Sequence, residues 1–344
     1  MSSDTGDNNG RDQLCGDGAS GGKISSKNEC TSCEQNNIDT ITKVLNSLAL
    51  PDDKSICSCC GKEGNSDNMN TCNKCKMVKY CNAACKKKHR TKHKKACERR
   101  VAELHEEALF KEHPPNEECP ICMQPLPHEP NVSSFMSCCG KTICSGCIYS
   151  IEMESKAKDL CAFCRTPHSS SYEEEIERIN KLIDKGNGEA YYSLGGGYLN
   201  GELGLPQDMT KATELFLKAG ELGYAEGYYN CGVNYCTGRG VEVDMKKANY
   251  YFELAAMNGH IKSRHNLGAY EGNDDNYHRA TKHYIIAAKA GYDASLERVK
   301  IGYKLGLVTK DEYASTLRAY HERRKEMKSD MRDEAKEMGY GQTN

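Results

Sequence analysis

Apolar residues are spread unevenly along the 344-residue chain, and their spacing predicts where it folds. Residues 1–50 are rich in Gly, Ser, Asp and Asn. This composition buries too little apolar surface to offset the loss of chain entropy, so we expect a disordered tail. Further along, Val101, Leu104 and Ala108 recur at helical intervals, which predicts a helical linker over residues 98–115.

The segment from residue 172 onward repeats itself. Phe216–Gly223 aligns with Phe252–Gly259 about 36 residues later, and a third copy ends at Gly291. Repeats of this length are typical of helical solenoids, so residues 172–292 are predicted to be all-α, with a capping helix before the first copy.

Polar and small residues mark the helix ends inside each repeat. Asp208 and Asp244 are plausible N-caps, and Gly223 is one of three glycines able to end a helix in left-handed geometry. The pattern resembles Sel-one-like repeats, relatives of the tetratricopeptide repeat, which implies protein binding on a concave face. We interpret the repeat tyrosines, Cys231 and Cys236 as core rather than ligand residues.

Residues 293–340 are predicted to form two C-terminal helices, Leu296–Leu307 and Lys310–Met338. Apolar positions in the second recur at alternating four and three residues, but Arg324 and Glu334 interrupt them. We therefore expect this helix to dock on the solenoid; a coiled-coil dimer is the alternative, and the sequence does not fix the oligomeric state.

Composition and charge narrow the class of protein. Lys and Arg together number 47 and Asp and Glu together number 49, so the charge predicts no overall attraction to nucleic acid or to a membrane surface. We also expect no membrane span and no leader, because no apolar run is long enough for either. Most of the 21 cysteines gather at 57–97 and 119–164 in short-spaced pairs. That spacing favours metal in a reducing compartment, so we expect an intracellular protein of the cytoplasm or nucleus.

The first cluster consists of four consecutive ligand pairs, which are Cys57/Cys60, Cys72/Cys75, Cys81/Cys85 and His93/Cys97. Eight ligands make two closed tetrahedral sites, which are structural because no position remains for water or substrate. The order resembles the MYND-type zinc finger over residues 57–97. The resemblance implies interleaved sites, one made by Cys57, Cys60, Cys81 and Cys85 and the other by Cys72, Cys75, His93 and Cys97, and recognition of partner peptides.

Three neighbouring features have competing interpretations. His89 could replace His93, but only His93 lies one helical turn before Cys97. Cys59 is interpreted as an unused neighbour of Cys60, and the lone Cys30/Cys33 pair as incidental thiols. The basic run 86–100 is interpreted as a solvated helix face; chromatin or nucleic-acid association is a weaker alternative that we do not expect.

The second cluster contains the pairs Cys119/Cys122, Cys144/Cys147 and Cys161/Cys164, with Cys138 and Cys139 between them. It resembles a RING domain over residues 119–167. The resemblance assigns Cys119, Cys122, Cys144 and Cys147 to one site and Cys161 and Cys164 to half of the other. The family's histidine position is Lys141 here, so Cys138 and Cys139 are the expected replacements, with His128 and His168 in reserve.

The RING resemblance implies a function without a nucleophile. Such a module binds a ubiquitin-conjugating enzyme and orients its thioester. The positions that carry this function in the family correspond to Ile121 and Arg165; the proline expected after the seventh cysteine is Ala162. The leading hypothesis is a ubiquitin ligase whose finger and repeats recruit protein substrates, and the alternative is a non-catalytic adaptor.

Together these patterns predict a multidomain fold. Two small cross-braced zinc modules of α+β type, stabilised by four zinc ions in all, follow a disordered tail and precede an all-α helical-repeat solenoid.

Overall fold

The computed structural model describes residues 55–64, 68–112, 117–127, 132–155 and 159–340. The predicted disordered tail, His128 and the Cys30/Cys33 pair lie outside these residues. The chain folds into two compact units, whose described parts are residues 55–111 and the region from residue 112 to residue 340.

The unit of residues 55–111 consists of two short hairpins and one long helix. β1 (Ser55–Ile56) pairs antiparallel with β2 (Glu63–Gly64), β3 (Asn70–Thr71) pairs with β4 (Lys79–Tyr80), and α2 spans Ala83–Leu109. The buried core is small and consists mainly of cysteine side chains with Met69 and Tyr80. A core of this size is small for independent stability, so we expect it to need metal ligation by its cysteines.

The helical linker predicted over residues 98–115 is not a separate element. α2 starts inside the finger, where the Asn82 side chain accepts a hydrogen bond from the Cys85 backbone N–H, and continues to Leu109. No glycine or proline interrupts the sequence between these ends, so the helix that carries the last finger ligands simply continues. Leu104 and Ala108 are buried, as their spacing predicted.

The larger unit begins with the second cysteine module, the described residues between 117 and 167. β5 (Ser133–Met136) pairs antiparallel with β6 (Lys141–Cys144), with Ser133 opposite Cys144, and α3 (Ser145–Ser155) follows directly. Ile143 is fully buried among the cysteines of this module. The hairpin therefore brings its turn and the start of α3 into one small core.

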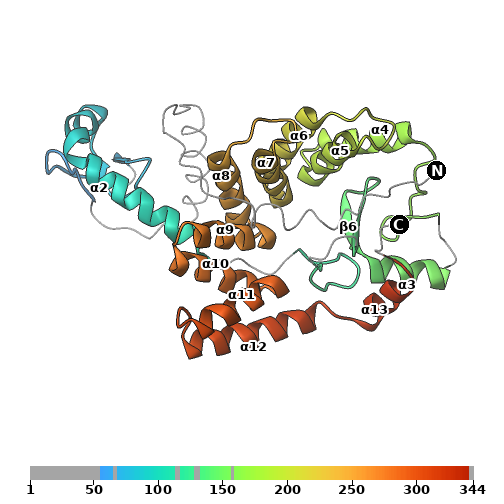
Figure 1. Cartoon of the computed structure of the whole chain (residues 1–344). Coiled ribbons are helices and arrows are strands. Elements are labelled where there is room, and N and C mark those ends of the chain that lie inside the picture. Colours follow the sequence, from blue (N-terminus) through green and yellow to red (C-terminus); the bar gives the residue numbers. More distant parts are fainter. Residues whose placement is uncertain (1–54, 65–67, 113–116, 128–131, 156–158, 341–344) are drawn as a thin grey trace. The chain divides into compact units, whose positions relative to one another are not determined.

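A helical solenoid follows this module. Its helices are α4 (Tyr172–Ile183), α5 (Gly188–Asn200), α6 (Met209–Glu221), α7 (Ala225–Thr237), α8 (Met245–Met257), α9 (Ile261–Asn273), α10 (Tyr277–Lys289) and α11 (Asp293–Lys304). Figure 1 shows α5 to α11 following one another in chain order. Asp208 and Asp244 cap α6 and α8 as predicted, and Gly223, Gly259 and Gly291 have positive φ.

Equivalent positions in the three repeats form the solenoid core. A glycine of the first helix faces an aromatic ring of the second: Gly195 faces Phe216, Gly232 faces Phe252 and Gly268 faces Tyr284. The absent side chains let the paired helices approach closely. Cys231 is buried among apolar neighbours, and burial raises the pKa of its thiol to about 12, in keeping with a core role.

Helical structure continues beyond the repeats to Glu337, in a form that differs from the prediction. The expected helix Lys310–Met338 is two helices, α12 (Lys310–Glu326) and α13 (Asp330–Glu337), and Ser329 caps the second. α12 packs on α10 and α11, so docking on the solenoid is confirmed for that half, whereas α13 packs on α3 of the cysteine module (Figure 1). The break allows α12 to pack on the solenoid and α13 to pack on the cysteine module.

None of the helices in the described part of the chain is both long enough and apolar enough to span a lipid bilayer.

Candidate metal centres

Four groups of ligand side chains come together in the structure. They are Cys57, Cys60, Cys81 and Cys85; Cys72, Cys75, His93 and Cys97; Cys119, Cys122, Cys144 and Cys147; and Cys138, Cys139, Cys161 and Cys164. Within each group all ligand atoms lie within 4.8 Å of one another, and every thiol is free. These are the four sets that the two resemblances implied.

Distances within the finger match tetrahedral coordination. A zinc ion with Zn–S bonds of about 2.3 Å places sulfur atoms about 3.8 Å apart. The Sγ of Cys81 lies 3.7 Å from that of Cys60 and 3.6 Å from that of Cys85, and Cys72 Sγ lies 3.8 Å from Cys97 Sγ. Such separations are far beyond a disulfide bond, so these groups are suited to zinc.

The structure also separates the two candidate histidines. His93 is buried and its Nε2 lies 3.3 Å from Cys75 Sγ, inside the second group. His89 stacks on His93 instead, and its Nδ1 lies 3.2 Å from the hydroxyl of the buried Tyr80. His89 therefore supports the ligand ring without belonging to the group.

The first group of the second cysteine module is the more deeply buried one. Cys119, Cys144 and Cys147 are at most 5% exposed, and Cys122 Sγ lies 3.8 Å from Cys144 Sγ. Cys144 ends β6 and Cys147 lies on the first turn of α3, so the hairpin and the helix present their thiols from adjoining positions.

The irregular group uses both adjacent cysteines. Cys138 and Cys139 lie in the turn between β5 and β6, where the backbone reverses. Cys138 Sγ is 3.4 Å from Cys164 Sγ, and Cys139 Sγ is 4.0 Å from Cys161 Sγ. These distances scatter more widely around the tetrahedral value than those of the other groups. Lys141 is exposed outside the group.

The four Cys-x-x-Cys turns share a backbone feature that spacing alone did not predict. These turns begin at Cys57, Cys72, Cys119 and Cys161. The residue after each pair has positive φ, and its N–H donates to the carbonyl of the first cysteine; these residues are Gly61, Lys76, Met123 and Arg165. Only one is a glycine. Left-handed geometry at a larger residue is costly, so ligation by the flanking thiols would stabilise it.

Two ligand thiols of the finger have pKa values that are shifted in opposite directions. Hydrogen bonding to the backbone N–H of Cys81, and to those of Cys60 and Cys59, overcomes burial and lowers the pKa of Cys57 to about 6. Burial and then the neighbouring Cys72 raise the pKa of Cys97 to about 12. Without a cation the clustered thiols cannot all ionise, whereas zinc would compensate their charge and close the fold.

The two positions implied to contact a conjugating enzyme differ in exposure. Ile121 is half-buried between the ligands of the first turn, and Arg165 is exposed. Two apolar side chains on the same turns are also exposed, Met123 at 68% and Phe163 at 44%. Each turn therefore exposes an apolar side chain to solvent, and the Cys161–Cys164 turn is followed by the exposed guanidinium of Arg165.

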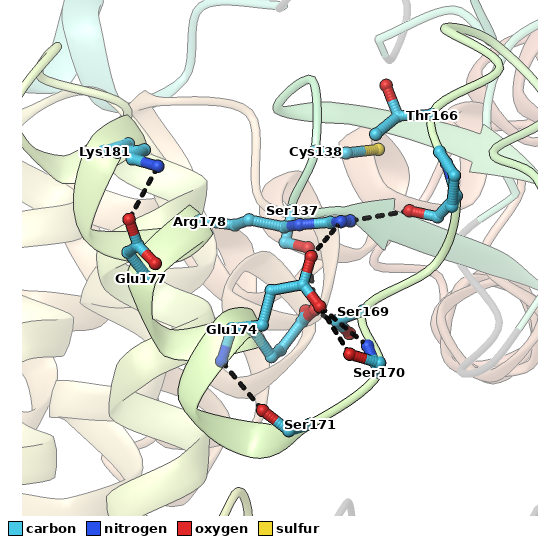
Figure 2. Close-up of polar contacts among 12 residues, drawn as sticks. Ser137, Cys138, Thr166, Ser169, Ser170, Ser171, Glu174, Glu177, Arg178 and Lys181 are labelled. Atoms are coloured by element: carbon cyan, nitrogen blue, oxygen red, sulfur yellow. Dashed lines mark hydrogen bonds and ion pairs between the residues drawn. The ribbon is translucent and has the colours of Figure 1, made fainter.

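Side-chain hydrogen bonds join the second cysteine module to α4, the first helix of the solenoid. Arg178 of α4 donates to the Pro167 carbonyl at 2.9 Å. Its guanidinium also pairs with Glu174, as Figure 2 shows. Glu175 accepts hydrogen bonds from Ser137, beside Cys138, and from Ser169. A cleft of about 600 Å³ lies between these elements, and His168, the reserve ligand, lines it rather than joining the metal group.

Family models match two parts of the chain. The Sel1 repeat matches residues 188–224, 225–260 and 261–292, and the MYND finger matches residues 57–97. These matches confirm the two corresponding resemblances and agree with the repeat length read from the sequence.

Two solved structures are similar in part. One is c5321, a protective antigen present in uropathogenic Escherichia coli strains with an SLR fold, at 24% identity and a TM-score of 0.40, covering 57% of this chain and 45% of that one. The other is a Sel1 repeat protein from Oxalobacter formigenes, at 19% identity and a TM-score of 0.39, covering 52% and 71%. The chain thus spans less than half of the first protein.

The fold and the ligand groups define a class of protein. It has a MYND finger, a Sel1-repeat solenoid and cysteine-rich groups suited to zinc. Repeats and fingers of these kinds generally mediate contacts between proteins, and the four ligand groups are suited to zinc.

Proposed function

We propose that the second cysteine module binds a ubiquitin-conjugating enzyme and promotes ubiquitin transfer, while the finger and the repeats recruit the protein substrate. In this proposal four zinc ions hold the two modules, and the protein works in a reducing compartment, the cytoplasm or nucleus. The module supplies no nucleophile; its contribution is to orient the enzyme's thioester.

One observation carries the proposal. The cysteine turns at Cys119–Cys122 and Cys161–Cys164 leave Met123, Phe163 and Arg165 exposed. Apolar side chains on turns held rigid by metal suit docking of a folded protein, because little conformational entropy is lost on binding. An exposed arginine beside them adds five directed donors for an enzyme or ubiquitin carbonyl.

An autoubiquitination assay with a panel of conjugating enzymes tests the proposal. We expect chains that disappear in Ile121→Ala and weaken in Arg165→Ala. Ile301→Ala and Arg298→Ala, which replace exposed residues of α11, are the matched controls and should retain activity. Zinc content is measured for each variant, because Ile121 is half-buried and its replacement could unfold the module. A loss of activity with full zinc content would then not be due to unfolding.

The adaptor hypothesis makes the opposite prediction. If no member of the panel gives ubiquitin chains with the zinc-loaded chain, transfer is refuted and a scaffold that only binds proteins remains. Binding of partner proteins to the repeats would then persist in Ile121→Ala and Arg165→Ala.

A further inference from the structure

The C-terminal helix α13 lies against the start of α3 in the second cysteine module. A Cβ atom on Gly146 would lie 2.9 Å from the backbone nitrogen of Arg332, so only glycine allows this approach. At the other end of the contact, Tyr340 donates a hydrogen bond to Glu152 and packs edge-on against Tyr149. The contact joins segments that are far apart in the sequence.

Arg332 is the buried centre of this contact. Its side chain is 7% exposed, and its Nη1 donates to the carbonyls of Pro125 at 2.9 Å and Met327 at 2.8 Å. Its Nη2 lies 3.5 Å from Cys122 Sγ and 3.5 Å from the Gln124 carbonyl. The guanidinium therefore reaches a candidate zinc ligand directly.

The charge of Arg332 needs an anionic neighbour. Its side-chain partners among the described residues are three backbone carbonyls and the Cys122 sulfur, with no carboxylate, although a buried cation without compensation is strongly unfavourable. Four thiolates around one Zn²⁺ carry a net charge of about −2, which would supply the missing compensation. N–H···S bonds to ligand sulfur would in turn stabilise the thiolates.

We propose that Arg332 is a positioning residue for the zinc site of Cys119, Cys122, Cys144 and Cys147, and that zinc occupancy and docking of α13 stabilise each other. The inference rests on zinc occupancy of this site, but not on ubiquitin transfer. The C-terminal segment is then part of the module, which is held by α4 on one side and by α13 on the other.

The coupling can be tested on the full zinc-loaded chain. The variants are Arg332→Met, which removes the charge, Arg332→Lys, which keeps the charge but loses the planar fork, and Arg318→Met, a matched control at an exposed arginine of α12. Native mass spectrometry follows zinc loss to an added chelator, and hydrogen exchange follows residues 330–340.

We expect one zinc to leave roughly 10- to 100-fold faster in Arg332→Met, with an intermediate rate in Arg332→Lys and no change in Arg318→Met. Exchange at residues 330–340 should rise both in Arg332→Met and in Cys119→Ser. On the Cys119→Ser background, Arg332→Met should leave the remaining zinc ions unaffected, which locates the effect at this site.

Unchanged zinc release and unchanged exchange in Arg332→Met would overturn the coupling while leaving the zinc assignment intact. A Cys119→Ser chain that keeps the wild-type number of zinc ions would overturn both the coupling and the assignment of this site. Neither result depends on ligase activity, which the autoubiquitination assay measures separately.

Discussion

Replacing Gly195 by alanine is expected to destabilise the repeats, whereas the same replacement at the next residue, Gly196, is expected to stabilise them. Both glycines lie within α5, so alanine should improve intrinsic helix propensity at either position by about 0.8–1 kcal/mol. The variants therefore share their chemistry and their helix, and differ only in what the new methyl group meets.

The structure gives the two methyl groups opposite surroundings. A Cβ at Gly195 would lie 2.8 Å from Cε1 and 2.9 Å from Cδ1 of Phe216, which is 1% exposed and has little room to move. A Cβ at Gly196 would meet nothing within 4 Å. Overpacking of a core costs about 1–3 kcal/mol, so Gly195→Ala should lose up to about 2 kcal/mol and the two variants should differ by about 1–3 kcal/mol.

Urea unfolding of the zinc-loaded chain, followed by far-UV circular dichroism, measures the difference. The midpoint should fall for Gly195→Ala and rise for Gly196→Ala, with unchanged slopes. Equal stabilisation by both replacements would refute the reasoning, because it would show that the α5–α6 contact can expand at no cost. Gly232→Ala, which would bring a Cβ within 2.6 Å of Phe252, should repeat the loss in the second repeat.

Two further predictions concern pH and metal. Burial raises the pKa of Glu189, which accepts a hydrogen bond from Thr142, to about 7, so the folded chain holds this proton more tightly than the unfolded chain. The free energy of unfolding should therefore fall as pH rises from about 5 to 7. The Glu189→Gln variant should show a flatter dependence of this free energy on pH. An identical dependence in the variant would contradict the raised pKa of Glu189. Removing zinc with a chelator should abolish hydrogen-exchange protection across residues 57–97, because the core of this unit is mainly ligand cysteines. Helices α5 to α10 should stay protected. Persistent protection in the finger would contradict a metal-dependent fold.

Spacing along the chain was sufficient to predict the helical repeats and the ligand pairs. Asp208 and Gly223 act through local backbone geometry, which the covalent sequence encodes within a few residues. The choice of His93 over His89 followed in the same way, because one helical turn separates His93 from Cys97. Zinc occupancy and ubiquitin transfer stay predictions.

Tertiary packing decided the rest. Ser329 is a local start signal for α13, but only packing decided where each helix docks, α12 on the solenoid and α13 on α3. Lys76, Met123 and Arg165 have left-handed backbones in the turns that carry the ligand cysteines, and residue type alone did not reveal them because none is a glycine. The position of Arg332, 3.5 Å from Cys122 Sγ, could not be predicted from spacing, because partners this far apart in sequence are selected by packing.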